Sequence, residues 1–297
     1  MKRYLMPFLI SFGLLLTACE KGEESSSVPT ELIVTDVPQS SVTQPQIFPL
    51  EIDGVEIKAE AQRVVSLSPA VTEIIAELGF ADRLFGISTY CDYPELTVQR
   101  VGSAENPDID MLTALEADVV FSLSALSERD VYALEEKGTA VICLDTPCDI
   151  DSYGVLYENI ASVFIGSEAA KNKALTAVEA LKTSADGAFS GSYIYISPKM
   201  TAAGVGTFEN AVLSLCGENL CASEGYSELL SLGEIQPDYI IAADTLSYND
   251  IAYDDVLSVY VYNGAKVLFV PSARFERPSA RTSEVFSAIS EQLTSEE

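Results

Sequence analysis

The hydrophobic residues of this chain form a pattern that changes along its length. An apolar run from Leu5 to Leu16 follows the basic residues Lys2 and Arg3. This run is too short to cross a bilayer, and a basic start followed by a short apolar stretch is typical of an export signal. From Glu20 to Gln46 the chain is instead rich in Ser, Glu, Pro, Thr and Gln. Such a segment buries too little apolar surface to fold, so it predicts a flexible tether.

Beyond the tether, short apolar runs alternate with segments of helical spacing. Asp53-Gly54 predicts a hairpin turn, and Arg63–Leu67 a buried strand. Ser68 and Pro69 then supply an N-cap and a first-turn proline for a helix that stops at Gly79. Further strands are expected at Leu84–Ile87, Val119–Phe121, Tyr193–Ile196 and Val267–Val270, and further helices around Met111–Leu115 and Phe208–Leu215. This alternation predicts parallel sheets covered by helices on both faces.

The second half of the chain repeats the order of the first. Leu112–Phe121 aligns with Leu232–Ile241 at a constant offset of 120 residues. Between the halves, apolar spacing predicts a helix from Ser167, which would cap it, to about Ala185. We therefore predict an α/β protein of two lobes with central parallel β-sheets, joined by a single long α-helix.

The residues after the apolar run suggest where the mature protein begins. Leu16-Thr17-Ala18-Cys19 matches the bacterial lipobox, whose cysteine receives a diacylglycerol. This predicts a membrane-anchored lipoprotein on the extracytoplasmic face of the cell membrane, attached through Cys19. The expected segments are a signal peptide (1–18), a tether (19–46), an N-terminal lobe (47–150), a linker containing the long helix (151–187) and a C-terminal lobe (188–297).

Composition excludes several classes of function. With 297 residues, 48% of them hydrophobic, the chain can bury a large core. Its 17 Lys and Arg against 45 Asp and Glu give a net charge of −28, which opposes binding to nucleic-acid phosphates. It contains no His, so His-dependent catalytic triads and His-ligated zinc are excluded. We predict no nucleic-acid partner, no catalytic residues and no enzymatic activity.

Five cysteines remain besides Cys19. Cys143 and Cys148 are five residues apart, as are Cys216 and Cys221, which is compatible with local disulfides in an exported protein. An odd thiol would then remain, and a host living without oxygen would leave every thiol reduced. Without His nearby we predict neither a metal site nor a cofactor.

Five motifs follow one another along the folded part of the chain. They are Arg63–Pro69 with Thr72-Glu73, Gly86–Pro94, Val101-Gly102 with Asn106–Ile109, Gly206–Phe208 with Cys216–Asn219, and Phe275–Pro278. From about Ile47 to Leu293, their order and spacing resemble the cobalamin- and iron-siderophore-type substrate-binding proteins of ABC importers. The resemblance implies a monomer that holds a small-molecule ligand between two lobes and delivers it to a permease dimer.

Within that family, Tyr-X-Asp-Tyr-Pro and Phe-Glu-Arg resemble most closely the cobalamin-binding members. That resemblance implies that the ring of Tyr90 packs against a corrin and that Arg277 donates to its peripheral amides from the opposite lobe. The other residues expected at the ligand are Tyr93, Phe275, Ser68, Pro69 and Arg274. Two positions that carry cleft tryptophans in cobalamin binders are here Ala104 and Arg274, which removes stacking area and adds a cation.

The alternatives to a cobalamin-binding protein are a different ligand for the same fold, an enzyme, or a module that binds a protein. Arg274 beside Arg277 suits an anionic ferric siderophore, and haem is a further ligand for the same fold, since Tyr can ligate ferric iron. A secreted enzyme is an alternative of another class, but the sequence has no Gly-X-Ser-X-Gly elbow, phosphate loop or metal-ligand cluster. A surface adhesion or sensory module would bind a protein and no small molecule.

The resemblance also implies docking on the permease through one carboxylate from each lobe. Asp110 falls at the position of the first, and Glu209 is nearest to the second. Such charge pairs steer encounter and fix register. Glu73 and Glu77 are expected on the solvated face of the first helix.

Overall fold

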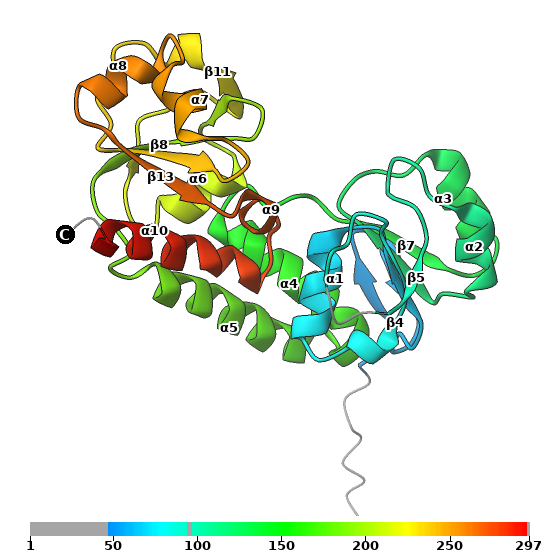
Figure 1. Cartoon of the computed structure of the whole chain (residues 1–297). Coiled ribbons are helices and arrows are strands. Elements are labelled where there is room, and N and C mark those ends of the chain that lie inside the picture. The colour runs from blue at the N-terminus through cyan, green and yellow to red at the C-terminus, as the bar shows by residue number, and fades with distance from the viewer. Residues whose placement is uncertain (1–46, 94–96, 296–297) are drawn as a thin grey trace, which may run out of the picture. The chain divides into compact units, whose positions relative to one another are not determined.

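The computed structural model describes residues 47–93 and 97–295, all within one compact unit, Pro45–Glu297 (Figure 1). This unit contains a short hairpin and two separate sheets. The predicted signal peptide, the tether and Cys19 lie outside the described residues.

The hairpin forms as the sequence predicts. Strands β1 (Leu50–Ile52) and β2 (Val55–Ile57) pair antiparallel. Asp53 and Gly54 between them have φ values of 48° and 79°. Positive φ at both central positions is the geometry that Asp-Gly adopts most readily in two-residue hairpins.

The first sheet is wholly parallel, with the strand order β5-β4-β3-β6-β7. Its strands are β3 (Val64–Ser66), β4 (Leu84–Ile87), β5 (Gln99–Arg100), β6 (Val119–Ser122) and β7 (Ala140–Cys143). The helices of this half are α1 (Pro69–Glu77), the 3-10 helix η1 (Ala81–Arg83), α2 (Ile109–Ala114) and α3 (Glu128–Glu135). The predicted strands and helices of this half are confirmed.

The second sheet has the order β11-β9-β8-β12-β13, with β10 also paired to β8. Its strands are β8 (Ser192–Ile196), β9 (Thr201–Ala203), β10 (Glu218–Asn219), β11 (Tyr226–Glu228), β12 (Tyr239–Ala243) and β13 (Lys266–Val270). The strands β8, β12 and β13 are parallel as predicted, but β9 and β11 run antiparallel to their neighbours. A tight turn closed by Ser197 N–H donating to Thr201 O (2.9 Å) sends the chain straight back, so β9 must reverse direction.

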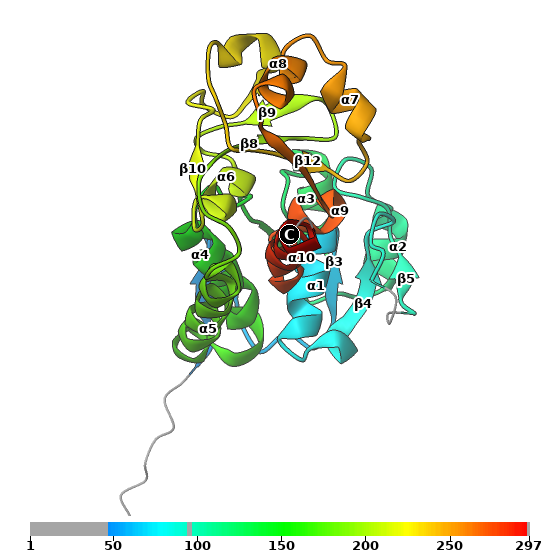
Figure 2. The ribbon, with the colours of Figure 1, turned by 60° about the vertical axis from the view of Figure 1, so that its left-hand side comes forward.

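The helices of the second half follow or connect these strands. They are α6 (Phe208–Leu213), the 3-10 helix η2 (Leu229–Leu232), α7 (Tyr248–Ala252), α8 (Leu257–Tyr262), α9 (Ser272–Phe275), the 3-10 helix η3 (Ala280–Ser283) and α10 (Glu284–Ser295). Both ribbon views place α10 and α9 beside α1 (Figures 1 and 2), and η3 contacts α1. The end of the chain therefore returns to the first half.

The connection between the two sheets contains two helices, where the sequence predicted a single long helix. It consists of α4 (Ile150–Ile165) and α5 (Ser167–Ala185), which pack against each other. The predicted bounds of α5 are confirmed, but Gly166 rather than Ser167 holds the N-cap position. Gly166 has a φ of 76°, and a Cβ there would lie 2.0 Å from Ile47 Cγ2. Only glycine fits this reversal between the two helices.

The hydrophobic core has three parts. The largest cluster includes Phe121 of the first sheet, Tyr195 of the second, Ile160 of α4 and Phe286 of α10. Two smaller clusters lie one on each sheet. Each sheet thus has a smaller hydrophobic cluster of its own, while the largest cluster links both sheets through the helices.

The internal repeat is confirmed by matching hydrogen bonds. In the first sheet, Asp118 Oδ2 accepts from Arg63 N–H (2.9 Å) at the start of β3. At the equivalent place in the second sheet, Asp238 Oδ2 accepts from the N–H and the hydroxyl of Ser192 (2.7 Å each). The two aspartates are the 120-residue pair of the alignment, so the halves share a construction as well as an element order.

The thiols are all free within the described part of the chain. Cys91, Cys143, Cys148, Cys216 and Cys221 form no disulfide there. Burial raises the pKa of the Cys216 thiol to about 11, which keeps that thiol protonated and unreactive at neutral pH. The same residues include no metal-binding group of three or more His, Cys, Asp or Glu. None of the helices in residues 47–93 and 97–295 is long and apolar enough to cross a membrane.

Candidate functional site

The carboxyl ends of four parallel strands share a turn built on a buried serine. Ser66, Ser88, Ser122 and Ser197 stand at the ends of β3, β4, β6 and β8. Each hydroxyl bonds to the backbone two residues further on; for example, Tyr90 N–H donates to Ser88 Oγ (3.2 Å) and Lys199 N–H to Ser197 Oγ (3.3 Å). Ligands of open α/β sheets bind outside the carboxyl ends of the strands. These turns therefore mark the edge of each sheet where a ligand site is expected.

A buried carboxylate links the two halves next to this edge. The side chain of Glu73 on α1 is fully buried. Its Oε1 accepts from Arg277 Nη1 (3.2 Å) and Arg281 Nη1 (2.9 Å), and its Oε2 accepts from Ser279 Oγ (2.7 Å). All three donors lie more than 200 residues away in sequence, in the segment that follows β13. We call Glu73, Arg277, Arg281, Ser279 and Asp92 the Glu73 cluster.

The expectation of a solvated Glu73 was wrong. The end of the chain covers this face of α1, and the two guanidinium groups and the hydroxyl replace the water that the carboxylate loses. Glu77, one turn later, keeps an exposed side chain. Its Oε2 accepts from Tyr157 OH (2.6 Å) and Ala280 N–H (3.1 Å). Both acidic residues of α1 therefore hold other elements in place.

Tyr90 and Arg277 come from different halves, and the Glu73 cluster brings their segments together. Arg277 Nη1 also donates to Asp92, two residues after Tyr90. Although burial raises the pKa of the Asp92 carboxyl, the hydrogen bond and charge of Arg277 leave that pKa below its ordinary value. Asp92 is thus an anion paired with Arg277, which joins the loop after β4 to the segment after β13. Tyr90 remains 67% exposed in that loop.

The other residues expected at the ligand have mixed positions. Ser68 is buried and Pro69 half-buried at the start of α1, although the Ser68 side chain makes no capping bond. Tyr93 is half-buried and packs against the main core. The exposed Arg274 pairs with Glu284. Ser68 and Pro69 thus lie just after the end of β3, and Arg274 lies in the segment after β13. Tyr93 lies at neither place.

Phe275 does not form a wall of a ligand site in this structure. It is fully buried, and its ring packs edge-on against Tyr195 with ring centroids 5.1 Å apart. The short helix α9 turns this side chain inward while it leaves Arg274 and Glu276 outside. The expectation that Phe275 contacts ligand is therefore corrected: it is a core residue.

The two carboxylates predicted to dock on the permease differ in their exposure. Asp110 is exposed in the first turn of α2. Glu209, in the first turn of α6, is only 4% exposed and bonds to Tyr226. Burial raises the pKa of the Glu209 carboxyl. A carboxylate that faces the protein interior offers nothing to a permease arginine, so the prediction for Glu209 was wrong.

Three charged residues of this region were not singled out from the sequence: Arg281, Lys199 and Glu276. Arg281 lies four residues after Arg277, just beyond the Phe275–Pro278 motif. Lys199 follows the end of β8 at the same distance as Tyr90 follows β4. Glu276 stands inside the motif itself. Their partners lie far away in sequence, so spacing alone does not reveal them.

Comparison with known proteins identifies the family. The pattern of the periplasmic binding protein family matches residues 64–266. The chain belongs to this family. It is 26% identical over 223 residues to the uncharacterized ABC transporter substrate-binding lipoprotein YvrC of Bacillus subtilis (strain 168), which covers 67% of this chain and 70% of that protein. It is 28% identical over 176 residues to a vitamin B12-binding protein of Yersinia pestis (strain Pestoides F), which covers 54% of this chain and 61% of the relative.

Solved structures share the fold. The periplasmic vitamin B12 binding protein BtuF of Vibrio cholerae has a TM-score of 0.59 at 20% identity, covering 79% of this chain and 97% of that one. The periplasmic heme-binding protein BhuT, in complex with two hemes, has a TM-score of 0.66 at 16% identity, covering 78% and 98%. These matches confirm the α/β fold. The family consists of binding proteins and not of enzymes, and the YvrC relative is named an ABC transporter substrate-binding lipoprotein, so this periplasmic binding protein captures a small molecule for a permease.

Proposed function

We propose that this binding protein captures a corrinoid at the carboxyl ends of its two sheets and presents it to the permease of an ABC importer. The observation that carries the proposal is the contact between Arg277 and Asp92, because it joins the segment after β13 to the loop that exposes Tyr90. A large flat ligand needs an aromatic face and a few fixed polar groups. Tyr90 supplies the face from the first half, and the segment after β13 supplies polar groups from the second.

The relatives include binding proteins for vitamin B12 and for heme. The Yersinia relative is named a vitamin B12-binding protein, and the B12-binding and heme-binding proteins share this fold. Charge favours the corrinoid. The chain has a net charge of −28, and the guanidinium groups of Arg277 and Arg274 are already paired with Glu73, Asp92 and Glu284. At Arg274 and Arg277 an anionic ferric siderophore or the propionates of haem would find no unpaired guanidinium group, whereas a corrin edged with neutral amides does not need one.

The predicted lipid anchor bears on the cellular location of the protein. The lipobox around Cys19 predicts a lipid anchor, and the YvrC relative is named a lipoprotein. We propose that Cys19 carries the lipid and holds the protein at the outer face of the cell membrane. The exposed Asp110 is our proposed contact to an arginine of the permease.

Tyr90 is the residue whose replacement tests the site. Truncation to alanine removes a stacking surface, so Tyr90→Ala is expected to weaken cobalamin binding by about 1–3 kcal/mol, the usual range for an aromatic anchor in a binding site. Isothermal titration of wild type and variant measures this change. Tyr132→Ala, at a tyrosine of α3 that is 63% exposed, is the matched control and should leave the affinity unchanged. Equal affinities of wild type and Tyr90→Ala would remove Tyr90 from the site.

A further inference from the structure

A cavity with two charged residues in its lining lies at the end of β8, beyond the residues that the proposed function uses. Its volume is about 360 Å3. It is lined by Ser197, Pro198, Lys199, Thr201, Tyr226 and Glu276. Ser197 forms the turn that ends β8, and Glu276 directly precedes Arg277. The cavity thus opens at the same sheet edge as the proposed site, and its volume, near the lower end of small-molecule pockets, is too small for a whole macrocycle.

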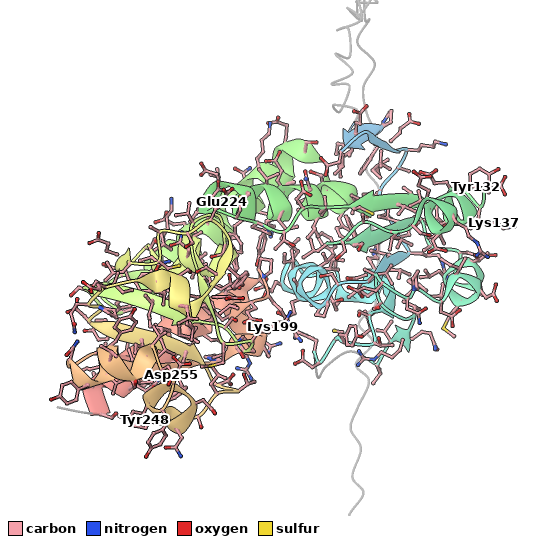
Figure 3. All side chains as sticks on the ribbon, turned by 90° about the horizontal axis from the view of Figure 1, so that it is seen from above. Tyr132, Lys137, Lys199, Glu224, Tyr248 and Asp255 are labelled. Carbon is pink, nitrogen blue, oxygen red and sulfur yellow. The ribbon has the colours of Figure 1, made fainter. Side chains whose placement is uncertain are left out.

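Lys199 brings a free positive charge to this cavity. Its side chain is exposed, and it forms no ion pair with any residue of 47–93 and 97–295. Figure 3 shows Lys199 at the border of the second half that is turned toward the first half. In a chain with 45 acidic residues, a lysine that stays unpaired at a sheet edge is available to a ligand.

Glu276 brings the opposite charge, held in a fixed position. Its Oε1 accepts from the hydroxyl of Tyr195 (3.2 Å), whose fully buried ring is packed by Phe275. Burial and the negative charge of Glu209 raise the pKa of Glu276, while Tyr195 and Lys199 lower it. Within the described part of the chain, Glu276 has no salt bridge, so Lys199 and Glu276 flank the cavity without neutralising each other directly.

A fixed acceptor and a free donor across a small cavity match one neutral group in particular. A primary carboxamide offers N–H groups to a carboxylate and a carbonyl to an ammonium, with no net charge to desolvate. A carboxylate in the same place would be attracted by Lys199 but repelled by Glu276 and Glu209. We propose that this cavity is a specificity pocket for a peripheral primary carboxamide of the ligand, with Glu276 accepting from the amide N–H and Lys199 donating to its carbonyl. This assignment rests on the proposed function and names the chemistry by which the second half selects its ligand.

The test compares cyanocobalamin with its monocarboxylate derivatives, each of which has one peripheral amide hydrolysed to an acid. For wild type, hydrolysis of the amide that enters the pocket should weaken binding by about tenfold or more, as expected when a hydrogen bond to a charged group is lost. In Glu276→Gln that preference for amide over acid should fall by about tenfold, because glutamine can donate to the acid. Lys199→Met should weaken the binding of cyanocobalamin by about the same factor.

Matched controls separate this role from general effects of charge. Asp255→Asn and Lys137→Met change the same charges at exposed positions away from the cavity, both labelled in Figure 3, and should leave every affinity unchanged. Circular dichroism and melting temperature show whether each variant is folded. If neither hydrolysis of any amide nor Glu276→Gln changed the affinity for the corrinoid, the assignment of the pocket would be wrong and the proposed function would stand. Failure of wild type to bind any corrinoid would overturn the proposed function, and the pocket with it.

Discussion

Replacement of Glu73 by alanine is expected to lower the free energy of unfolding by about 3–5 kcal/mol, the usual cost of removing one partner from a buried ion pair. The variant leaves Arg277 and Arg281 without their shared partner. Arg277 keeps Asp92, while Arg281 keeps only looser contacts to Asp92 (3.9 Å) and Glu284 (3.7 Å). Because total stability is usually 5–15 kcal/mol, this is a large fraction of it.

Urea denaturation followed by circular dichroism measures the effect of Glu73→Ala. Glu179→Ala on α5 is the matched control, since Glu179 is an exposed helical glutamate and its removal leaves no buried charge. Glu73→Gln should fall between the two, because the amide oxygen still accepts from Ser279. A loss below about 1 kcal/mol, the range of exposed ion pairs, would show that the Glu73 cluster does not hold the two halves together.

Phe275→Ala is expected to cost about 3–5 kcal/mol of stability, as is typical when a buried phenylalanine is truncated. The ring is fully buried and lies against Tyr195, so its removal leaves a cavity beneath α9. Tyr195 would lose the neighbour that keeps its hydroxyl on Glu276. The change should therefore appear in urea denaturation whether or not ligand is present.

An exposed aromatic residue provides the control for this variant. Tyr253 is 82% exposed, and Tyr253→Ala should change the stability by less than about 0.5 kcal/mol, as surface substitutions usually do. If Phe275→Ala kept full stability and instead lost ligand affinity, Phe275 would be a wall of the ligand site, as the family resemblance had implied.

The elements of the fold that depend on sequence neighbours could be predicted. Asp53-Gly54 defines its hairpin by the φ values that its own residues prefer. Helix α1 starts at Pro69 and ends before Gly79 because both residues act within one turn of the helix. The aspartates of the internal repeat, Asp118 and Asp238, hold equivalent strand starts because the two halves share a local construction.

The features that depend on distant partners could not be predicted. Glu73 lies 204 and 208 residues from the two arginines that bury it, and its place on an amphipathic helix resembled that of a solvated residue. Phe275 packs inward against Tyr195 and Glu209 bonds to Tyr226, and the order of residues reveals neither contact. The reversal at Gly166 likewise requires knowing that Ile47 fills the space beside it.

The most direct test of the account is to ask which ligand the protein retains. Purified protein is mixed with equal amounts of cyanocobalamin, haem and a ferric siderophore, passed through gel filtration, and the absorbance spectrum of the protein peak is recorded. We expect the peak to carry the corrinoid spectrum at one ligand per chain. A peak that carries haem or siderophore absorbance, or no chromophore at all, would contradict it.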